Sequence, residues 1–363
     1  MRAACATIHL TALRANLALL RSRAPASRLM AVVKADGYGH GLERVARALA
    51  TADAFGVASI ADGLRLRAAG AAQRIVVLSG PDELGDLAEL RRLRLDAVIH
   101  HEAQLELLAA ETDPRPLRVW LKLDSGMHRL GFPAARAREV HARLRAMPGV
   151  DPDIVLMTHF ANSDVFDDAQ TLRQIECFTQ AVAGLGATTS LANSAAILGW
   201  PAAHGDWLRA GGALYGMSVS EGSSGADFGL QAAMTLATRL VAINRVSKGA
   251  RIGYGATWEA PEDMDIGVAA VGYGDGYPRS ASAGTPVLVG GRRAQLIGRV
   301  SMDLITLDLR GHADARIGDP VVLWGQGLAV EEVAAHAGTI AYDLTCGVTR
   351  RVMFAEDDLQ APA

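Results

Sequence analysis

Short apolar runs, each bounded by glycine or polar residues, recur along the first 216 residues of the chain. In order they are LMAVVK (29–34), AFGVAS (54–59), RIVVLSG (74–80), DAVIHH (96–101), RVWLKLD (118–124), IVLMTHF (154–160), TTSLANS (188–194) and LRAGGALYG (208–216). Runs of this length that are rich in aliphatic residues are typical of strands buried on both faces. The pattern therefore predicts eight buried strands.

The segments between these runs have the periodicity of amphipathic helices. After the first run, apolar residues recur at i, i+3, i+4 and i+7 from Leu42 to Leu49, and charged residues take the opposite face. Strands that alternate with helices eight times predict an α/β fold, a (β/α)8 TIM barrel. A doubly wound open sheet fits the same alternation and stays open as the alternative.

The pattern changes near residue 230. Segments such as VAINRVSKGARIGYGATW (241–258) and TPVLVGGRRAQLIGRVSMDLITLDL (285–309) are β-branched runs separated by glycine turns. They predict a second, mostly β domain after the barrel. We expect the barrel to span residues 9–229 and the β domain to span 230–363, with residues 1–8 joining the second domain as a strand.

Composition and charge exclude several classes of protein. Half of the 363 residues are hydrophobic and 21% are charged, which indicates a globular chain with a large core and argues against disorder. The formal net charge of −3 is small, and arginines alternate with apolar residues at helical spacing, so no nucleic-acid partner is expected.

Cysteine usage and hydropathy indicate the compartment. Cys5, Cys177 and Cys346 are an odd number of widely separated residues, which fits a reducing environment better than a disulfide framework. The N-terminal segment lacks the apolar core of a signal peptide, and the chain has no run of 18 apolar residues. We therefore expect a cytoplasmic protein that does not interact with a membrane.

Lys34 is the candidate nucleophile. It is the last residue of the first predicted strand, and barrel active sites lie at the C-terminal ends of the strands. Burial among apolar neighbours would lower its pKa and release a neutral amine that can attack a carbonyl to form a Schiff base. A lysine at a strand mouth with its charge in water is the simpler alternative.

Polar residues at the ends of other predicted strands strengthen the case for Lys34. They are Lys122, Arg129, His159, Asn193, Ser194, Arg209, Gly211 and Gly212. Glycines and small residues after the last two strands of a barrel often bind phosphate through backbone N–H groups, and the Ser194 hydroxyl adds a donor. A lysine, a phosphate site and an imidazole together indicate pyridoxal phosphate.

Eight motifs then resemble those of a known family, in the family's order. They are KADGYGHG, LKLDSGMHRLGF, THFANSD, LANSAAILGW, LRAGGALYG, GYGATW, GYGDGYPR and GRVSMD, and they resemble the successive motifs of bacterial alanine racemases over nearly the whole chain. The resemblance implies a pyridoxal 5'-phosphate enzyme that interconverts L-alanine and D-alanine. It also implies a homodimer in which each β domain completes the active site of the partner.

The resemblance assigns roles to individual residues. Lys34 would form the aldimine with the cofactor and act as the base on one face of the substrate, and Tyr254 of the partner subunit would act on the other face. Racemisation removes a proton from one face of Cα and returns one to the other, so two opposed bases make chemical sense. Arg209 would face the pyridine nitrogen and, because it stays protonated, would keep that atom unprotonated and weaken the electron sink.

The remaining assignments concern binding. The phosphate ligands would be Tyr38, Ser194, Gly211 and Gly212, and His159 would support the cofactor ring. Arg129 and the Met302 backbone would bind the substrate carboxylate. Lys122 and Asp303 would support these binding groups. Lys122 matches a position that is carbamylated in some family members. Ala210, Arg350 and Met353 depart from the family's usual proline, tyrosine and proline, which leaves the substrate range open.

Several alternatives remain at this point. A decarboxylase of basic amino acids would use the same lysine, but Arg209 argues against it because that class places a carboxylate at the ring nitrogen. Three other functions also stay open: a single-barrel cofactor carrier, a Schiff-base aldolase and a broad-spectrum racemase. The sequence also leaves open whether the enzyme supplies D-alanine for the cell wall or degrades it. His100 and His101 lack partners at metal-ligand spacing, and GYGDGY lacks the helix of a dinucleotide site, so neither a metal nor a dinucleotide is expected.

Overall fold

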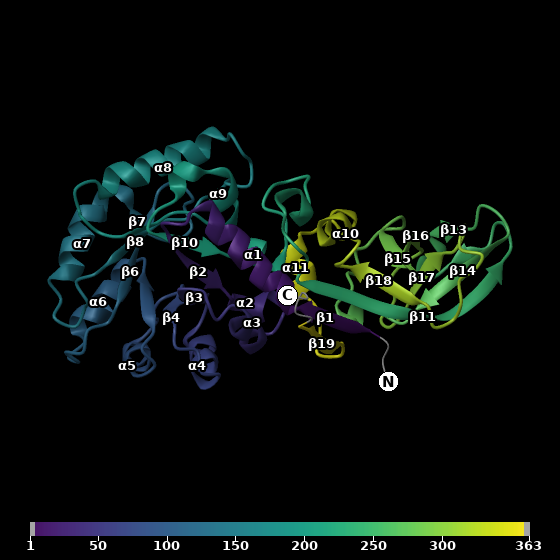
Figure 1. Ribbon diagram of the computed structural model, residues 1–363, viewed down its shortest axis with the longest axis horizontal. Coiled ribbons are helices and arrows are strands. Elements are labelled where there is room, and N and C mark those ends of the chain that lie inside the picture. The colour runs from purple at the N-terminus through teal and green to yellow at the C-terminus, as the bar shows by residue number, and fades with distance from the viewer. Residues whose placement is uncertain (1–3, 359–363) are drawn as a thin grey trace. The chain divides into compact units, whose positions relative to one another are not determined.

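The computed structural model describes residues 4–358, which form two compact units (Figure 1). One unit comprises Arg14–Leu214 and Val219–Gly222, and the other comprises the rest of the described chain. Residues 1–3 of the predicted first strand and 359–363 of the predicted β domain lie outside the described residues. The domain boundaries predicted from the sequence stay predictions.

The first unit is a ring of parallel strands. The strands are β2 (Arg28–Val32), β3 (Ala54–Val57), β4 (Arg74–Val77), β5 (Asp96–Ile99), β6 (Val119–Asp124), β8 (Val155–Met157), β9 (Thr189–Ser190) and β10 (Trp207–Ala210), with the two-residue β7 (Phe132–Pro133) beside β6. They pair in the order β10-β2-β3-β4-β5-β6-β8-β9. The Arg209 N–H donates to the Ala192 carbonyl at 3.0 Å, which links the segment after β9 to β10. The predicted eight strands and the TIM-barrel class are confirmed.

Helices cover the outside of this ring (Figure 1). They are α3 (Leu42–Ala48), α4 (Ile60–Ala68), α5 (Leu84–Arg92), α6 (Glu102–Ala110), α7 (Ala137–Arg145), α8 (Ala169–Val182) and α9 (Ser194–Gly199), and α1 (Leu10–Arg23) precedes the first strand. Local sequence sets their starts: Asp168 accepts the N–H groups of Gln170 and Thr171 at the start of α8, and Asn193 accepts that of Ala196 at the start of α9.

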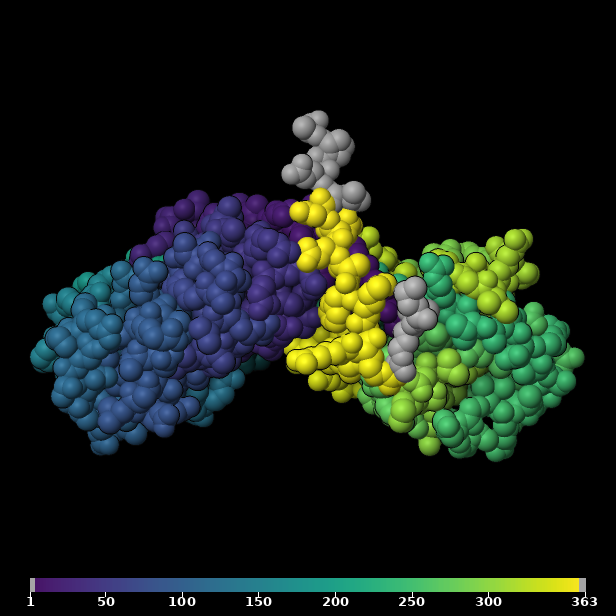
Figure 2. Space-filling view, turned by 90° about the horizontal axis from the view of Figure 1, so that it is seen from below, coloured from purple at the N-terminus to yellow at the C-terminus, as the bar shows by residue number. Residues whose placement is uncertain are grey.

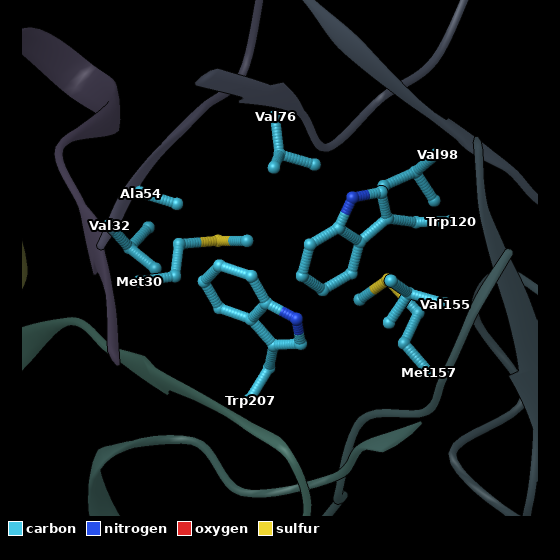
Figure 3. Packing of buried hydrophobic residues seen from close by; sticks show 9 residues of the cluster. All are labelled: Met30, Val32, Ala54, Val76, Val98, Trp120, Val155, Met157 and Trp207. Carbon is cyan, nitrogen blue, oxygen red and sulfur yellow. The ribbon is translucent and has the colours of Figure 1, made fainter. Parts of the chain in front are cut away.

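Two tryptophans fill the interior of the barrel (Figure 3). The rings of Trp120 and Trp207 lie 5.4 Å apart, and both side chains are fully buried among aliphatic residues from the surrounding strands. Trp120 Nε1 donates to Asp96 Oδ2 at 3.1 Å, and Arg74 pairs with the same carboxylate at 2.6 Å. This packed layer makes the barrel a solid core, which fixes the strand ends that carry polar residues.

The second unit is built on a mixed sheet in the order β14-β17-β16-β15-β18-β11-β1-β19. Its strands are β1 (Cys5–His9), β11 (Met234–Val246), β14 (Met264–Ala269), β15 (Pro286–Val289), β16 (Arg292–Ile297), β17 (Ile305–Asp308), β18 (Pro320–Trp324) and β19 (Met353–Asp357), with the hairpin β12 (Arg251–Ile252) and β13 (Trp258–Glu259). The helices α10 (Val330–Ala337) and α11 (Ala341–Cys346) belong to it.

Strand β1 lies inside this sheet although it begins the chain. It pairs antiparallel with β11 and parallel with β19, which is partly exposed and is drawn in yellow in Figure 2. His9 Nδ1 lies 3.3 Å from Asp357 Oδ2, and His9 Nε2 lies 2.9 Å from Thr235 Oγ1, so a side-chain network crosses the three strands. Within residues 4–358, no helix combines the length and apolar character that a bilayer span requires.

Candidate active site

A left-handed turn follows Lys34. The residue begins the short element α2 (Lys34–Tyr38), in which Ala35, Asp36, Gly37 and Tyr38 have φ angles of 52°, 53°, 63° and 53°. This conformation costs a residue with a side chain roughly 1–2 kcal/mol, and three of the four residues are not glycine. Strain of this kind is often found at functional sites, where the surrounding structure enforces it.

Asp36 holds this turn in place. Its carbonyl accepts the Gly41 N–H at 2.8 Å, and its Oδ1 accepts the Leu42 N–H at 3.2 Å and an Arg65 N–H at 2.7 Å. Partial burial acts to raise the pKa of Asp36, but the bonds from Arg65 and Leu42 outweigh it and lower this pKa below its usual value. The carboxylate therefore stays charged at neutral pH and compensates for part of the strain.

The structure corrects two expectations about Lys34. Strand β2 ends at Val32, so Lys34 is not its last residue, and the Lys34 residue is exposed rather than buried. The left-handed turn takes the chain out of the barrel wall directly after Val33, and the apolar pattern of LMAVVK does not reveal that bend. The prediction that Lys34 is buried among apolar neighbours is therefore wrong.

A small polar cradle lies between Tyr38 and the segment after β10. Ser194 Oγ accepts the N–H groups of Gly211 at 2.8 Å and Ala213 at 3.3 Å. A Cβ at Gly211 would lie only 2.7 Å from Tyr38 Oη and 4.0 Å from Ser194 Oγ, so the glycine leaves the space between these hydroxyls open. With Gly212 next in the chain, the four predicted phosphate ligands lie close together.

Arg209 is buried at the centre of the site. Its Nη1 donates to the carbonyl and the hydroxyl of Ser190 at 2.8 and 2.7 Å, and its Nη2 donates to the carbonyls of Thr158 and Leu191 at 2.6 and 3.1 Å. Burial lowers the pKa of Arg209 to about 10, so the guanidinium stays charged at neutral pH. Among residues 4–358, no carboxylate pairs with it, and its Nε–H has no bonded acceptor.

His159 is a neutral imidazole fixed by Arg209. Arg209 Nη2 also donates to His159 Nδ1 at 3.3 Å, so that nitrogen is the acceptor and Nε2 carries the proton. Burial, and then the charges of Arg209, Lys122, Arg129 and Lys34, holds the pKa of His159 well below its usual value. A ring in this state can pack against a ligand without adding charge.

Lys122 completes a group of cations at the barrel mouth. It is buried on β6, and burial, followed by the charges of Arg209, Arg129 and Lys34, lowers its pKa to about 8, although Asp124 opposes the shift. These four cations and His159 lie on, or just after, the strands β2, β6, β8 and β10, and they influence one another electrostatically. A site with this excess of positive charge favours an anionic ligand.

The depressed pKa of Lys122 predicts a pH dependence of stability in the cofactor-free protein. Below pH 8 the lysine is protonated in both the folded and the unfolded protein, and the folded protein carries the free-energy cost of burying that charge. Between its folded pKa of about 8 and its ordinary value of 10.5, Lys122 is deprotonated in the folded protein but still protonated in the unfolded protein. Lys122 therefore destabilises the folded state less as pH rises. We expect the free energy of unfolding, measured with urea, to rise over this range relative to Lys122→Met. If the free energy of unfolding of the wild type and of Lys122→Met changed in parallel with pH, the lowered pKa of Lys122 would be contradicted.

Two family models match the chain over most of its length. The alanine racemase N-terminal domain matches residues 8–219, and the alanine racemase C-terminal domain matches residues 233–355. The chain belongs to the alanine racemase family. The predicted family and the predicted enzyme class, an amino acid racemase, are confirmed, and the C-terminal match argues against a single-barrel cofactor carrier.

Individual alanine racemases agree with this assignment. The alanine racemase of Nitrosococcus oceani is 52% identical over 347 residues, 96% of this chain and 97% of that protein. The structure of the biosynthetic alanine racemase from Pseudomonas aeruginosa has a TM-score of 0.95 at 48% identity and covers 98% of this chain and 100% of that chain. The Bartonella henselae alanine racemase, with covalently bound pyridoxal phosphate, has a TM-score of 0.88 at 23% identity over 98% and 100% of the two chains and shows the fold alone.

Three residues predicted from alanine racemase motifs belong to the second unit. Tyr254 lies between Gly253 and Gly255, both with φ of 72°, and is 70% exposed. Met302 is 52% exposed, and its carbonyl accepts the Gly274 N–H at 3.0 Å. Asp303 forms an ion pair with Arg351.

Several buried polar residues behind the site were not predicted. They are Ser125, Thr158, Gln174 and Ser190, which bond to one another, to Arg209 or to the His159 backbone. One signal was present: Gln174 lies on the buried face of α8, at i+3 from Thr171 and one residue before Ile175. A glutamine in such a stripe must find buried partners.

His100 bonds to the loop after β4 and to α6. Its Nε2–H donates to the Ser79 carbonyl at 2.9 Å, and its N–H donates to Gln104 Oε1 at 2.8 Å. In the part of the chain that the structure describes, no group of three or more His, Cys, Asp or Glu side chains is arranged to hold a metal ion.

Proposed function

We propose that this protein is a pyridoxal-phosphate-dependent alanine racemase that interconverts L-alanine and D-alanine. One observation carries the proposal: Lys34, the polar cradle beside Gly211 and the buried, charged Arg209 lie at the mouth of one barrel in a member of the alanine racemase family. The relatives from Nitrosococcus oceani and Pseudomonas aeruginosa, both alanine racemases, support the substrate, and the Bartonella henselae alanine racemase with covalently bound pyridoxal phosphate supports the cofactor.

The residues present fit pyridoxal phosphate. A phosphate dianion needs N–H and O–H donors near positive charge. The hydroxyls of Tyr38 and Ser194 and the backbone at Gly212 would supply them beside the cation group, and the Gly211 N–H would join them by exchanging its bond to Ser194 Oγ for one to the phosphate. When bound, the cofactor supplies an aldehyde that joins amines covalently and a conjugated ring that withdraws electrons from the substrate Cα.

The two proposed bases are Lys34 and Tyr254 of the partner subunit. Lys34 would hold the cofactor through its Nζ, and the same amine, when free, would take or return a proton on one face of Cα. Tyr254 of the partner subunit takes or returns the proton on the opposite face through its Oη. Its high exposure leaves it accessible to a second copy of the chain, in keeping with the proposed homodimer.

Arg209 and His159 set the electronic environment. Arg209 can only donate hydrogen bonds, and its Nε–H is the donor left for a ring nitrogen once Nη1 and Nη2 have bound protein acceptors. As a donor only, it would keep a proton from that position and so limit electron withdrawal by the ring, which would disfavour side reactions. The neutral His159 ring packs beside the cofactor. Arg129 and the Met302 backbone of the partner subunit bind the substrate carboxylate, and Lys122 and Asp303 support these groups.

The direct test is proton exchange at Cα. Purified protein loaded with pyridoxal phosphate is incubated in D₂O with a single enantiomer of alanine, and chirality and mass are followed. We expect racemisation together with deuterium at Cα. Retention of the Cα proton, with the cofactor bound, is incompatible with the proposed reaction. Parallel assays of serine and larger amino acids separate an alanine racemase from a broad-spectrum one.

The cradle predicts the effect of Gly211→Ala. The added Cβ must displace the Tyr38 hydroxyl, which lies 2.7 Å from its position, so we expect the Kd for pyridoxal phosphate to rise at least about tenfold. The measurement is a titration of the cofactor-free protein by absorbance. Gly85→Ala is the matched control, because its Cβ would meet nothing closer than Glu83 Oε1 at 3.6 Å. Equal affinities in the two variants would argue against this phosphate site.

The proposal also includes a cytoplasmic location and the domain boundaries 9–229 and 230–363. The proposed dimer is checked by sedimentation, and a monomer with full activity would exclude a shared active site.

A further inference from the structure

A buried glutamine joins two loops at the mouth of the barrel. Gln174 on α8 is 1% exposed. Its Oε1 accepts the Ala161 N–H at 2.9 Å, and its Nε2 donates to the His159 carbonyl at 3.2 Å and to Ser125 Oγ at 3.4 Å. One side chain therefore holds the loop after β8 on both sides of Phe160 and also reaches the loop after β6.

These bonds lead directly to the groups proposed to contact the cofactor. Ser125 Oγ lies 2.7 Å from Thr158 Oγ1, and the Thr158 carbonyl accepts the short bond from Arg209. Arg209 in turn fixes the His159 ring through Nδ1. Gln174 thus holds the His159 backbone, and Arg209 holds the His159 ring. The hydroxyls of Ser125 and Thr158 connect Gln174 to the residue that accepts the bond from Arg209.

The loop after β6 is shaped to accept this side chain. Gly126 has φ of 133°, and a Cβ built there would lie 3.3 Å from Gln174 Cγ. The same loop continues to Arg129, the proposed carboxylate ligand. Gln174 therefore packs against the start of one ligand-binding loop while it hydrogen-bonds the other.

The chain contains a matched counterpart to Gln174. Gln104 on α6 is also fully buried, and its Oε1 accepts the His100 N–H at 2.8 Å. Its Nε2 donates to the carbonyls of Ser79 and Pro81, both at 3.1 Å. Chemistry, burial and number of bonds match, but Gln104 joins the loops after β4 and β5, which carry none of the residues proposed to contact cofactor or substrate.

We propose that Gln174 is a positioning residue that holds His159, and through Ser125 and Thr158 also Arg209, in register with the cofactor ring. This role rests on the proposed function. Gln174 touches neither cofactor nor substrate, and it acts by fixing the position of the His159 main chain. Misplacement of a binding group by about 1 Å can cost a reaction on the order of 100-fold.

The test compares Gln174→Met with Gln104→Met, since methionine keeps the length of glutamine without its hydrogen bonds. In cofactor-free protein at pH 7.5, ¹⁵N spectra of labelled histidine rings report the tautomer of His159, assigned with His159→Gln. We expect the wild-type ring to carry its proton on Nε2, the Gln174→Met ring to mix both tautomers, and Gln104→Met to retain the wild-type signal. In loaded protein we expect a shifted cofactor absorption band and a 10- to 100-fold loss of kcat with Gln174→Met alone.

Gln174→Glu keeps the acceptor for Ala161 and removes both donated bonds, so it serves as the second variant if Gln174→Met does not fold. An unchanged His159 spectrum in the folded Gln174 variant, or equal loss of kcat in the two Met variants, overturns the proposal. A changed His159 tautomer in a protein whose wild type does not racemise alanine supports the positioning role and refutes the proposed function instead.

Discussion

Replacing Lys34 by alanine is expected to abolish racemisation and covalent attachment of the cofactor. The variant loses both the amine that joins the aldehyde and one of the two bases, and a general base alone contributes roughly 10²–10⁴-fold. Borohydride reduction followed by peptide mass analysis measures the attachment, and polarimetry measures the rate. We expect an adduct on the peptide that contains Lys34 in the wild type and none in the variant.

The lysine content of the chain makes this experiment selective. The sequence contains only three lysines, Lys34, Lys122 and Lys248. Lys248→Ala is the control, because that residue lies in a turn of the second unit and should leave both readouts unchanged. A reduced adduct that persists in Lys34→Ala would place the imine on Lys122, the other lysine of the barrel mouth, and would refute the assignment of Lys34.

Replacing Tyr254 by phenylalanine is expected to separate the two faces of the substrate. Exchange of the α-proton that faces Tyr254 of the partner subunit should fall by roughly 10²–10⁴-fold, whereas exchange from the opposite enantiomer, served by Lys34, should stay near the wild-type rate. Net racemisation cannot reveal this asymmetry. Because the equilibrium constant between enantiomers is one, kcat/KM must fall equally in the two directions.

The measurement is therefore deuterium incorporation into each enantiomer before it racemises. Tyr342→Phe, a change at a tyrosine of α11 in the same unit with no proposed role, should leave both exchange rates unaltered. If Tyr254→Phe slows exchange from both enantiomers to the same extent, the assignment of opposed bases fails.

The barrel could be predicted from the sequence because its strands are buried on both faces and so read as continuous apolar runs. The exact ends of these strands could not be predicted. The run at 188–194 became the two-residue strand β9, and the run at 29–34 became β2, which stops at Val32. Apolar residues continue into buried turns, and hydrophobicity alone does not distinguish a strand from the loop that follows it.

The same contrast applies to the candidate site. Lys122, Arg129, His159 and Arg209 could be grouped in advance because parallel strands bring their C-terminal ends to one rim. The exposure of Lys34 could not be foreseen, since it follows from the left-handed turn after Val33. Gln174 was also missed: its place in the buried stripe of α8 signals burial, but the sequence does not reveal that its partners come from two distant loops.

The position of β1 constrains the order of events during synthesis. Cys5 to His9 precede the barrel in the sequence, but they pair with residues 234–237 and 353–357, which are synthesised much later. The parallel ring needs only residues up to 214 and has all its strands long before then. Strand β1 must therefore wait, with its edges unpaired, until β11 and β19 have emerged, and premature pairing with another nascent chain is the hazard of this arrangement.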